Sequence, residues 1–131
     1  METRDCSQFT SDLININVQD ELNKGTLLHY ACKFGEIEAV KYLIKNGANR
    51  FIEDSNGETP IFYILKFCDN VDLIRTVLGV DESFPHISEL LLHKNFENFD
   101  VMQIAIQNGR RNIANYLLQK FPEFYGIVLS L

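Results

Sequence analysis

Two segments of the chain repeat one pattern of residues at a spacing of 33. The first is Thr26-Leu-Leu-His-Tyr-Ala-Cys-Lys-Phe-Gly35, and the second is Thr59-Pro-Ile-Phe-Tyr-Ile-Leu-Lys-Phe-Cys68. Each segment is followed by apolar residues at helical spacing, which are Ala39, Val40, Leu43 and Ile44 in the first and Leu73, Ile74, Val77 and Leu78 in the second. A fixed period of about 20–50 residues is typical of stacked units that share a continuous core. The sequence therefore predicts a repeat architecture.

Residues suited to turns and helix ends recur within this pattern. Thr26 is expected to be an N-cap, because its hydroxyl can accept a hydrogen bond from the first helical turn. Pro60 occupies a first helical position, where the missing N–H costs nothing. Gly35 is expected to separate two helices, Gly47 to end the second helix, and Asn56-Gly57 to form a tight turn.

The motif of Thr, Pro or Leu, an apolar residue, His or Phe, any residue and Ala, followed by Asn46-Gly47-Ala48, resembles the ankyrin repeat. The resemblance covers most of residues 15–121. It implies an all-α ankyrin-repeat solenoid of helix-turn-helix repeats with β-turn fingers. Three positions depart from the family pattern: Leu27 replaces proline, Phe62 replaces histidine, and Phe51 stands where asparagine is usual. These departures concern the hydrogen bonds of the fingers more than the fold.

A third unit is less regular. Val101-Met-Gln-Ile-Ala-Ile-Gln-Asn-Gly109 matches the segment that ends at Gly35, but it lies eight residues later than two periods would place it. One extra residue lies near Cys68, and the others lie between Leu78 and Asp100. There Pro85 precedes Ile87, Leu90 and Leu91 at helical spacing, which predicts a helical insertion between the second and third repeats.

We therefore expect one ankyrin-repeat domain over residues 1–131. Its predicted parts are a partial N-terminal cap (1–20), a repeat (21–53), a second repeat (54–80), an insertion (81–95), a third repeat (96–121) and an apolar C-terminal tail (122–131).

Composition excludes several classes of function. The net charge of −6 disfavours nucleic acid, whose backbone most of the surface would repel. The sequence has no run of 18 apolar residues and does not begin like a secretion signal, so we expect neither a membrane span nor a membrane partner. Cys6, Cys32 and Cys68 have no metal or disulfide spacing, and Cys32 is expected to be buried. A reducing compartment follows, with the cytoplasm expected and the nucleus also possible.

No arrangement of residues indicates catalysis, a cofactor or a metal. The sequence has no phosphate-binding glycine loop, nucleophile elbow or Ser/His/Asp order. His86 and His93 are seven residues apart, whereas a zinc-binding helix usually has two histidines at i and i+4. His29 lies within the repeat motif, and the family resemblance implies that it hydrogen-bonds to the backbone of a neighbouring finger. We expect a protein that is not an enzyme.

A candidate binding surface comes from two matching pairs, Lys33-Phe34 and Lys66-Phe67. The resemblance places these pairs at the ends of first helices, along the concave groove. Aromatic and cationic residues are common in interfaces, although both rings could instead pack inward. The predicted protein-binding residues are Tyr30, Lys33, Phe34, Asn56, Glu58, Tyr63, Lys66, Phe67 and Gln107.

The function that the resemblance implies is the binding of another protein through the concave face, without turnover. Two alternatives stay open. One is an inhibitor, of the kind that masks a transcription factor or a kinase in host signalling, as viral and pathogen mimics do. The other is a structural component that associates with itself.

The apolar tail bears on the oligomeric state. Phe124 to Leu131 contains six large apolar side chains and no charge. Pro122 ends the last helix, so we expect the tail to fold back on Ile113 and Leu117 in a monomer. A homodimer through the tail is the alternative, and coverage by a further repeat is a third possibility.

Overall fold

The computed structural model describes residues 15–125. These residues form α2 (Leu27–Lys33), α3 (Ile37–Lys45), α4 (Pro60–Phe67), α5 (Val71–Leu78), η1 (Val80–Glu82), α6 (Ile87–Leu92), α7 (Val101–Gln107) and α8 (Arg111–Lys120). Residues 122–125 are also helical, and no β-strand is present between residues 15 and 125. The prediction of an all-α solenoid is confirmed. None of these helices is both long and apolar enough to cross a bilayer.

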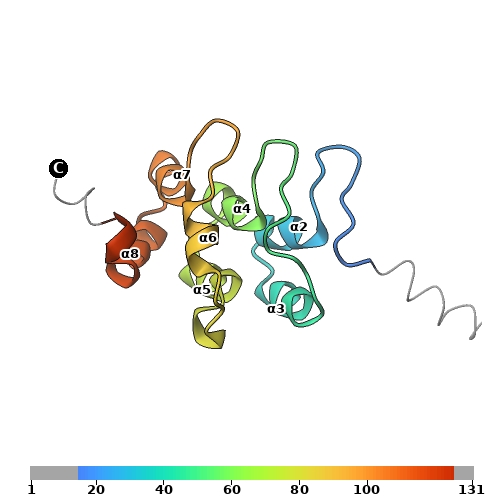
Figure 1. Cartoon of the computed structure of the whole chain (residues 1–131), viewed down its shortest axis with the longest axis horizontal. Coiled ribbons are helices and arrows are strands. Elements are labelled where there is room, and N and C mark those ends of the chain that lie inside the picture. Colours follow the sequence, from blue (N-terminus) through green and yellow to red (C-terminus); the bar gives the residue numbers. More distant parts are fainter. Residues whose placement is uncertain (1–14, 126–131) are drawn as a thin grey trace, which may run out of the picture.

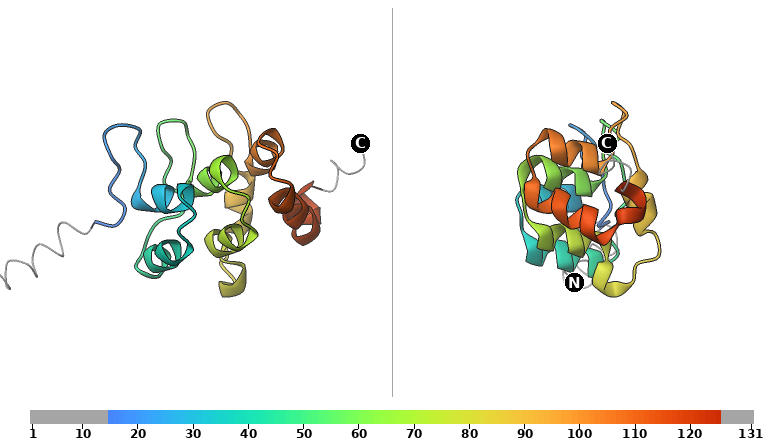
Figure 2. Two further views of the ribbon diagram at one scale, coloured as in Figure 1. Left: turned by 180° about the vertical axis from the view of Figure 1, so that it is seen from behind. Right: turned by 90° about the vertical axis from the view of Figure 1, so that its left-hand side faces the viewer.

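The helices form two rows. The inner row contains α2, α4 and α7, and the outer row contains α3, α5 and α8, with each helix packed on the next in its row. The loop before each inner helix extends to one side as a finger, so that three fingers line up along the molecule (Figure 1). The left view in Figure 2 shows the same order of elements from behind, with the two ends of the described chain at opposite ends of the solenoid, and the right view looks along the row of repeats.

The expected N-cap is present at the start of α2, and an N-cap of the same kind starts α7. The hydroxyl of Thr26 accepts from the backbone N–H of His29, and the carboxylate of Asp100 accepts from that of Gln103. In both helices the side chain of the third residue accepts a hydrogen bond from the backbone N–H of the cap residue, which completes a capping box. At α4 the third residue is Phe62, which has no polar side chain to accept such a bond.

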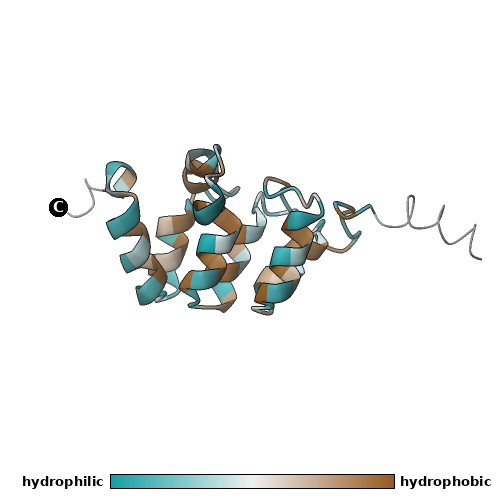
Figure 3. Cartoon of the chain, turned by 90° about the horizontal axis from the view of Figure 1, so that it is seen from below, coloured by the Kyte–Doolittle hydropathy of each residue, from teal (hydrophilic) through white to brown (hydrophobic). Residues whose placement is uncertain are grey.

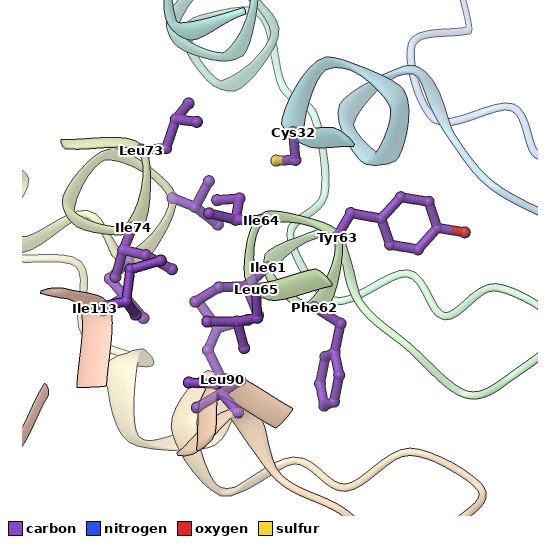
Figure 4. Close-up of a cluster of buried hydrophobic side chains, with 14 of the residues drawn as sticks. Cys32, Ile61, Phe62, Tyr63, Ile64, Leu65, Leu73, Ile74, Leu90 and Ile113 are labelled. Atoms are coloured by element: carbon purple, nitrogen blue, oxygen red, sulfur yellow. The ribbon is translucent and has the colours of Figure 1, made fainter. Parts of the chain in front are cut away.

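The core is centred on α4. All residues from Pro60 to Leu65 are buried, because this helix packs against α2, α5 and α7. Figure 4 shows side chains from α2, α4, α5, α6 and α8 meeting in this cluster. Cys32 is buried there, as predicted, and burial raises the pKa of its thiol. The outer helices keep polar residues on their outward face (Figure 3).

The helical insertion predicted from the sequence is present as α6. Leu90 and Leu91 are fully buried, so this short helix is part of the core and not a linker. Phe51, one of the departures from the family pattern, packs against Phe84 of the same segment with ring centroids 6.1 Å apart. The unusual aromatic residue thus contacts the insertion.

The C-terminal part of the described chain contacts the core at two places, through Arg110 and through the start of the tail. Arg110, just before α8, donates from Nε to the carbonyl of Leu65 at 2.7 Å and from Nη2 to that of Lys66 at 2.5 Å. It therefore satisfies the last carbonyls of α4. In the tail, Tyr125 is buried and Phe124 is half-buried against the core. The rest of the predicted tail, residues 126–131, lies outside the described residues.

Candidate functional site

Two aromatic rings and one lysine form an exposed cluster at the ends of α2 and α4. Phe34 is 67% exposed and Phe67 is 52% exposed, so neither ring packs inward. The ammonium of Lys33 lies 5.5 Å from the centre of the Phe34 ring and 5.1 Å from that of Phe67. These distances allow a cation–π interaction with each ring. We call Lys33, Phe34 and Phe67 the concave cluster.

The concave cluster borders a hollow between the first two fingers and the inner helices. This hollow has a volume of about 180 Å³, and its lining residues are Asn23, Tyr30, Lys33, Asn56, Glu58, Tyr63, Lys66 and Phe67. Seven of the nine predicted binding residues therefore lie together. Phe34 is not among the lining residues, but its ring shares the Lys33 ammonium with Phe67. Gln107 does not line the hollow either and is exposed at the end of α7.

A network of tyrosine and carboxylate side chains fixes the floor of this hollow. The Tyr30 hydroxyl donates to Asp20, and that hydrogen bond lowers the pKa of the Asp20 carboxyl. The Tyr63 hydroxyl donates to Asp54 at 2.5 Å and accepts from Asn23 at 3.2 Å. Burial first, and then the bond to Asp54, raise the pKa of Tyr63. Each of the first two fingers is thus tied to the helix behind it through a tyrosine hydroxyl.

The structure corrects the expected roles of Glu58 and Tyr63. They are only 1% and 6% exposed, so their side chains are not free surface for a partner. The Glu58 carboxylate accepts from Lys66 Nζ at 2.5 Å and from Asn95 Nδ2 at 2.8 Å. Its partners belong to α4 and to the third finger, which explains its burial. Lys66 is also partly engaged by this ion pair, and Lys33 forms no ion pair within residues 15–125.

The second finger is contacted by a histidine from each side. His29 Nε2 lies 2.9 Å from the carbonyl of Glu58, as the family resemblance implied. His93, at the end of α6, lies 2.9 Å from the carbonyl of Gly57 and packs against Phe62. The exposed His86 pairs instead with Glu89 of its own helix. No group of three or more potential metal ligands occurs between residues 15 and 125.

A second hollow adjoins the concave cluster at the N-terminal end of the described solenoid. It has a volume of about 390 Å³ and lies between α2 and α3. Leu27, Tyr30, Phe34 and Tyr42 contribute to its apolar lining. Tyr30 and Phe34 therefore join this apolar hollow to the cluster. This second hollow was not predicted from the sequence.

Comparison with known proteins identifies the architecture. A family model described as ankyrin repeats (3 copies) matches residues 4–86, which is more than half of the chain. The chain belongs to the ankyrin-repeat family. The expected all-α ankyrin solenoid is therefore confirmed in both its helices and its family.

Several ankyrin-repeat proteins are similar in sequence. Ankyrin repeat domain-containing protein 40 of Mus musculus is 32% identical over 95% of this chain and 30% of its own length. Putative ankyrin repeat protein FPV223 of fowlpox virus is 28% identical over 73% of this chain and 70% of its own length. Regulatory protein SWI6 of Saccharomyces cerevisiae is 31% identical over 49% of this chain and 8% of its own length. The chain spans less than a third of the mammalian and yeast relatives.

Family membership bears on the kind of activity. Ankyrin repeats generally mediate protein–protein interaction and are typically not enzymes. The prediction of a protein-binding module is confirmed at that level.

Proposed function

We propose that this ankyrin solenoid binds a partner protein through its concave face, with the concave cluster at the centre of the contact. The observation that supports the proposal is the pair of exposed rings on either side of the Lys33 ammonium. Large exposed aromatic side chains cost free energy in water, and burial by a partner removes that cost. The adjoining apolar hollow enlarges the surface that a partner can cover.

The charge of the cluster indicates the kind of partner surface. Lys33 is the cation that lies between the rings, and Lys66 already pairs with the buried Glu58. An apolar segment that carries an acidic side chain fits this arrangement, because the acid can pair with Lys33 while apolar groups cover the rings.

The experiment is a quantitative comparison of proteins captured from the source cell. Wild-type protein is compared with a Phe34→Ala/Phe67→Ala variant and with Leu92→Ala, which removes an exposed apolar side chain from α6, outside the cluster. We expect one partner to be lost with the double variant and kept with the control. Circular dichroism checks that helicity is unchanged. A partner retained equally by all three proteins contradicts the proposal.

The activity of the captured partner distinguishes an inhibitor from an adaptor. If the solenoid blocks the partner's activity in a purified assay, it acts as an inhibitor of the kind considered above. If the partner stays active while bound, the solenoid acts as an adaptor.

A further inference from the structure

A cavity of about 480 Å³ lies on the outer side of the solenoid, between α3, α5 and η1. Its lining includes four basic side chains, Lys41, Lys45, Arg50 and Arg75, and two acidic ones, Asp81 and Glu82. The lining is therefore basic in excess, although the whole chain carries a net charge of −6. None of the residues of the concave cluster contributes to this cavity.

Arg50 is the buried member of the group. It is 6% exposed, and its guanidinium lies over the ring of Phe84 at 4.1 Å. Nη2 donates to Glu82 at 3.1 Å, whereas Nε is buried without a hydrogen-bond partner in the described part of the chain. Arg50 lines the cavity, and within residues 15–125 its guanidinium donates only to Glu82, so a further N–H donor of the same group is left for an acceptor from outside. The stacking on Phe84 keeps this donor in a fixed plane.

The acidic residues beside the arginines are easy to displace. Asp81 accepts from Arg75 at 2.8 Å, but the side chains of Asp81 and Glu82 are 76% and 62% exposed. Exposed ion pairs contribute little stability, so an anion with more charge can replace them. Lys45 has no ion pair within residues 15–125, and Lys41 makes only a 3.8 Å contact with Glu38. Both lysines can turn toward such an anion.

We propose that this cavity binds a phosphate monoester, carried either by a free small molecule or by a phosphorylated side chain of a partner. A phosphate monoester brings nearly two negative charges and three acceptor oxygens, which matches the guanidinium and ammonium groups better than one carboxylate does. Asp81 and Glu82 are internal competitors for the same donors. The site is separate from the concave cluster, so it does not depend on the proposed protein-binding function.

Isothermal titration calorimetry tests the proposal with two probes. One is inorganic phosphate, and the other is a short phosphoserine peptide, with the unphosphorylated peptide as the blank. We expect saturable binding of at least one probe. Binding of phosphate as tight as that of the peptide assigns the site to a free small molecule, and tighter binding of the peptide assigns it to a phosphorylated partner. If neither probe gives a measurable heat of binding, the proposal is wrong.

Substitutions at exposed residues of the cavity locate the binding site and leave the buried Arg50 unchanged. Lys45→Glu should weaken binding by at least tenfold, and Glu82→Gln should strengthen it several-fold because it removes a competitor. Lys120→Glu makes the same charge change at the exposed end of α8 and serves as the control. Equal affinity in Lys45→Glu and Lys120→Glu contradicts the assignment to this cavity.

Discussion

Asn95 donates a hydrogen bond from Nδ2 to Oε2 of Glu58 at 2.8 Å, and this bond joins the third finger to the second. Both residues are buried, Glu58 at 1% and Asn95 at 5% exposure. Asn95 Oδ1 also accepts from the backbone N–H groups of Glu97 and Phe99, so it shapes its own finger as well. The Glu58 carboxylate is therefore a shared acceptor for Lys66 of its own repeat and for Asn95 of the third finger.

Glu58→Ala should lower the free energy of unfolding by about 2–3 kcal/mol, because it leaves Asn95 without its partner and Lys66 without its ion pair. Urea denaturation followed by circular dichroism measures the effect. Glu89→Ala, which removes a carboxylate whose side chain is 64% exposed, should change the stability by less than about 0.5 kcal/mol. A loss at Glu58 as small as that at Glu89 rules out a structural role for the shared acceptor.

Gly57→Ala should be more destabilising than Gly47→Ala. Both glycines have positive φ, +74° and +97°, which costs an alanine about 1–2 kcal/mol. A Cβ at Gly57 would also lie 2.5 Å from the ring of Phe96, whereas one at Gly47 meets nothing within 4 Å. We expect Gly57→Ala to cost about 1–2 kcal/mol more than Gly47→Ala.

Phe96→Ala tests the origin of that difference. Phe96 is 72% exposed, so its removal alone should cost little. In the Phe96→Ala background the two glycine substitutions should become equally costly, because the clash is gone and only the backbone strain stays. If Gly57→Ala keeps its extra cost there, the ring is not responsible.

Stability should fall as the pH drops below about 6.5, in part because of His29. Burial lowers the pKa of this fully buried ring. Nδ1 accepts from the backbone N–H of Thr26, so a proton there would break that bond. Between the lowered folded pKa and the unfolded value near 6.5, only the unfolded chain binds the proton. Unfolding is therefore favoured as the pH falls through this window, by at most about 1.4 kcal/mol per pH unit.

His29→Gln should remove this contribution to the pH dependence. Gln103 occupies the same capping position in α7, where it accepts from the N–H of Asp100 at 2.8 Å, so glutamine is a suitable replacement. His86→Gln, at an exposed position, is the control. Denaturation midpoints between pH 5 and pH 8 are compared. If the midpoint of His29→Gln changes with pH as much as that of the wild type, His29 does not contribute to the pH dependence.

Once a partner is known, Phe34→Ala and Phe67→Ala should each weaken binding by about 1–3 kcal/mol. Lys33→Gln should also weaken it and should reduce its dependence on salt, because Lys33 supplies the attraction to an acidic group. Calorimetry at two salt concentrations measures both effects. Binding that strengthens with added salt is incompatible with an acidic partner surface.

Tyr125→Ala should destabilise the protein by about 2–4 kcal/mol, because this ring is 3% exposed against the core. Glu123→Ala, at an exposed neighbouring position, should have almost no effect. Light scattering on both variants and on the wild type should give the mass of a monomer. A wild-type dimer that Tyr125→Ala converts into an equally stable monomer identifies the tail as an interface instead.

The repeat period was sufficient to predict most helices, because the apolar spacing, the caps and the turn glycines agree with one another. The position of the insertion also followed from counting residues between Gly35 and Gly109. What counting does not provide is the path of the inserted segment. His93 lies 36 residues after Gly57 in the sequence, and yet its ring contacts the Gly57 carbonyl. Phe62, which stands where the family pattern has histidine, has no polar side-chain group for such a contact.

The binding residues were harder to predict than the fold. The period predicted that Phe34 and Phe67 lie in matching positions, and both are exposed. Glu58 was predicted as a protein-binding residue, but it is only 1% exposed. Its burial depends on Asn95, whose approach becomes visible only when the third finger is placed in space.

The burial of α4 on several sides has a consequence for synthesis of the chain on the ribosome. Residues Pro60–Leu65 are covered by α2 from one side and by α7 from another. α2 is made earlier, but α7 begins only at Val101. A nascent chain that stops between these points carries one of its most apolar helices with a face open to water. The protein therefore completes its core only when the third repeat has left the exit tunnel, and chains that end before it are expected to aggregate.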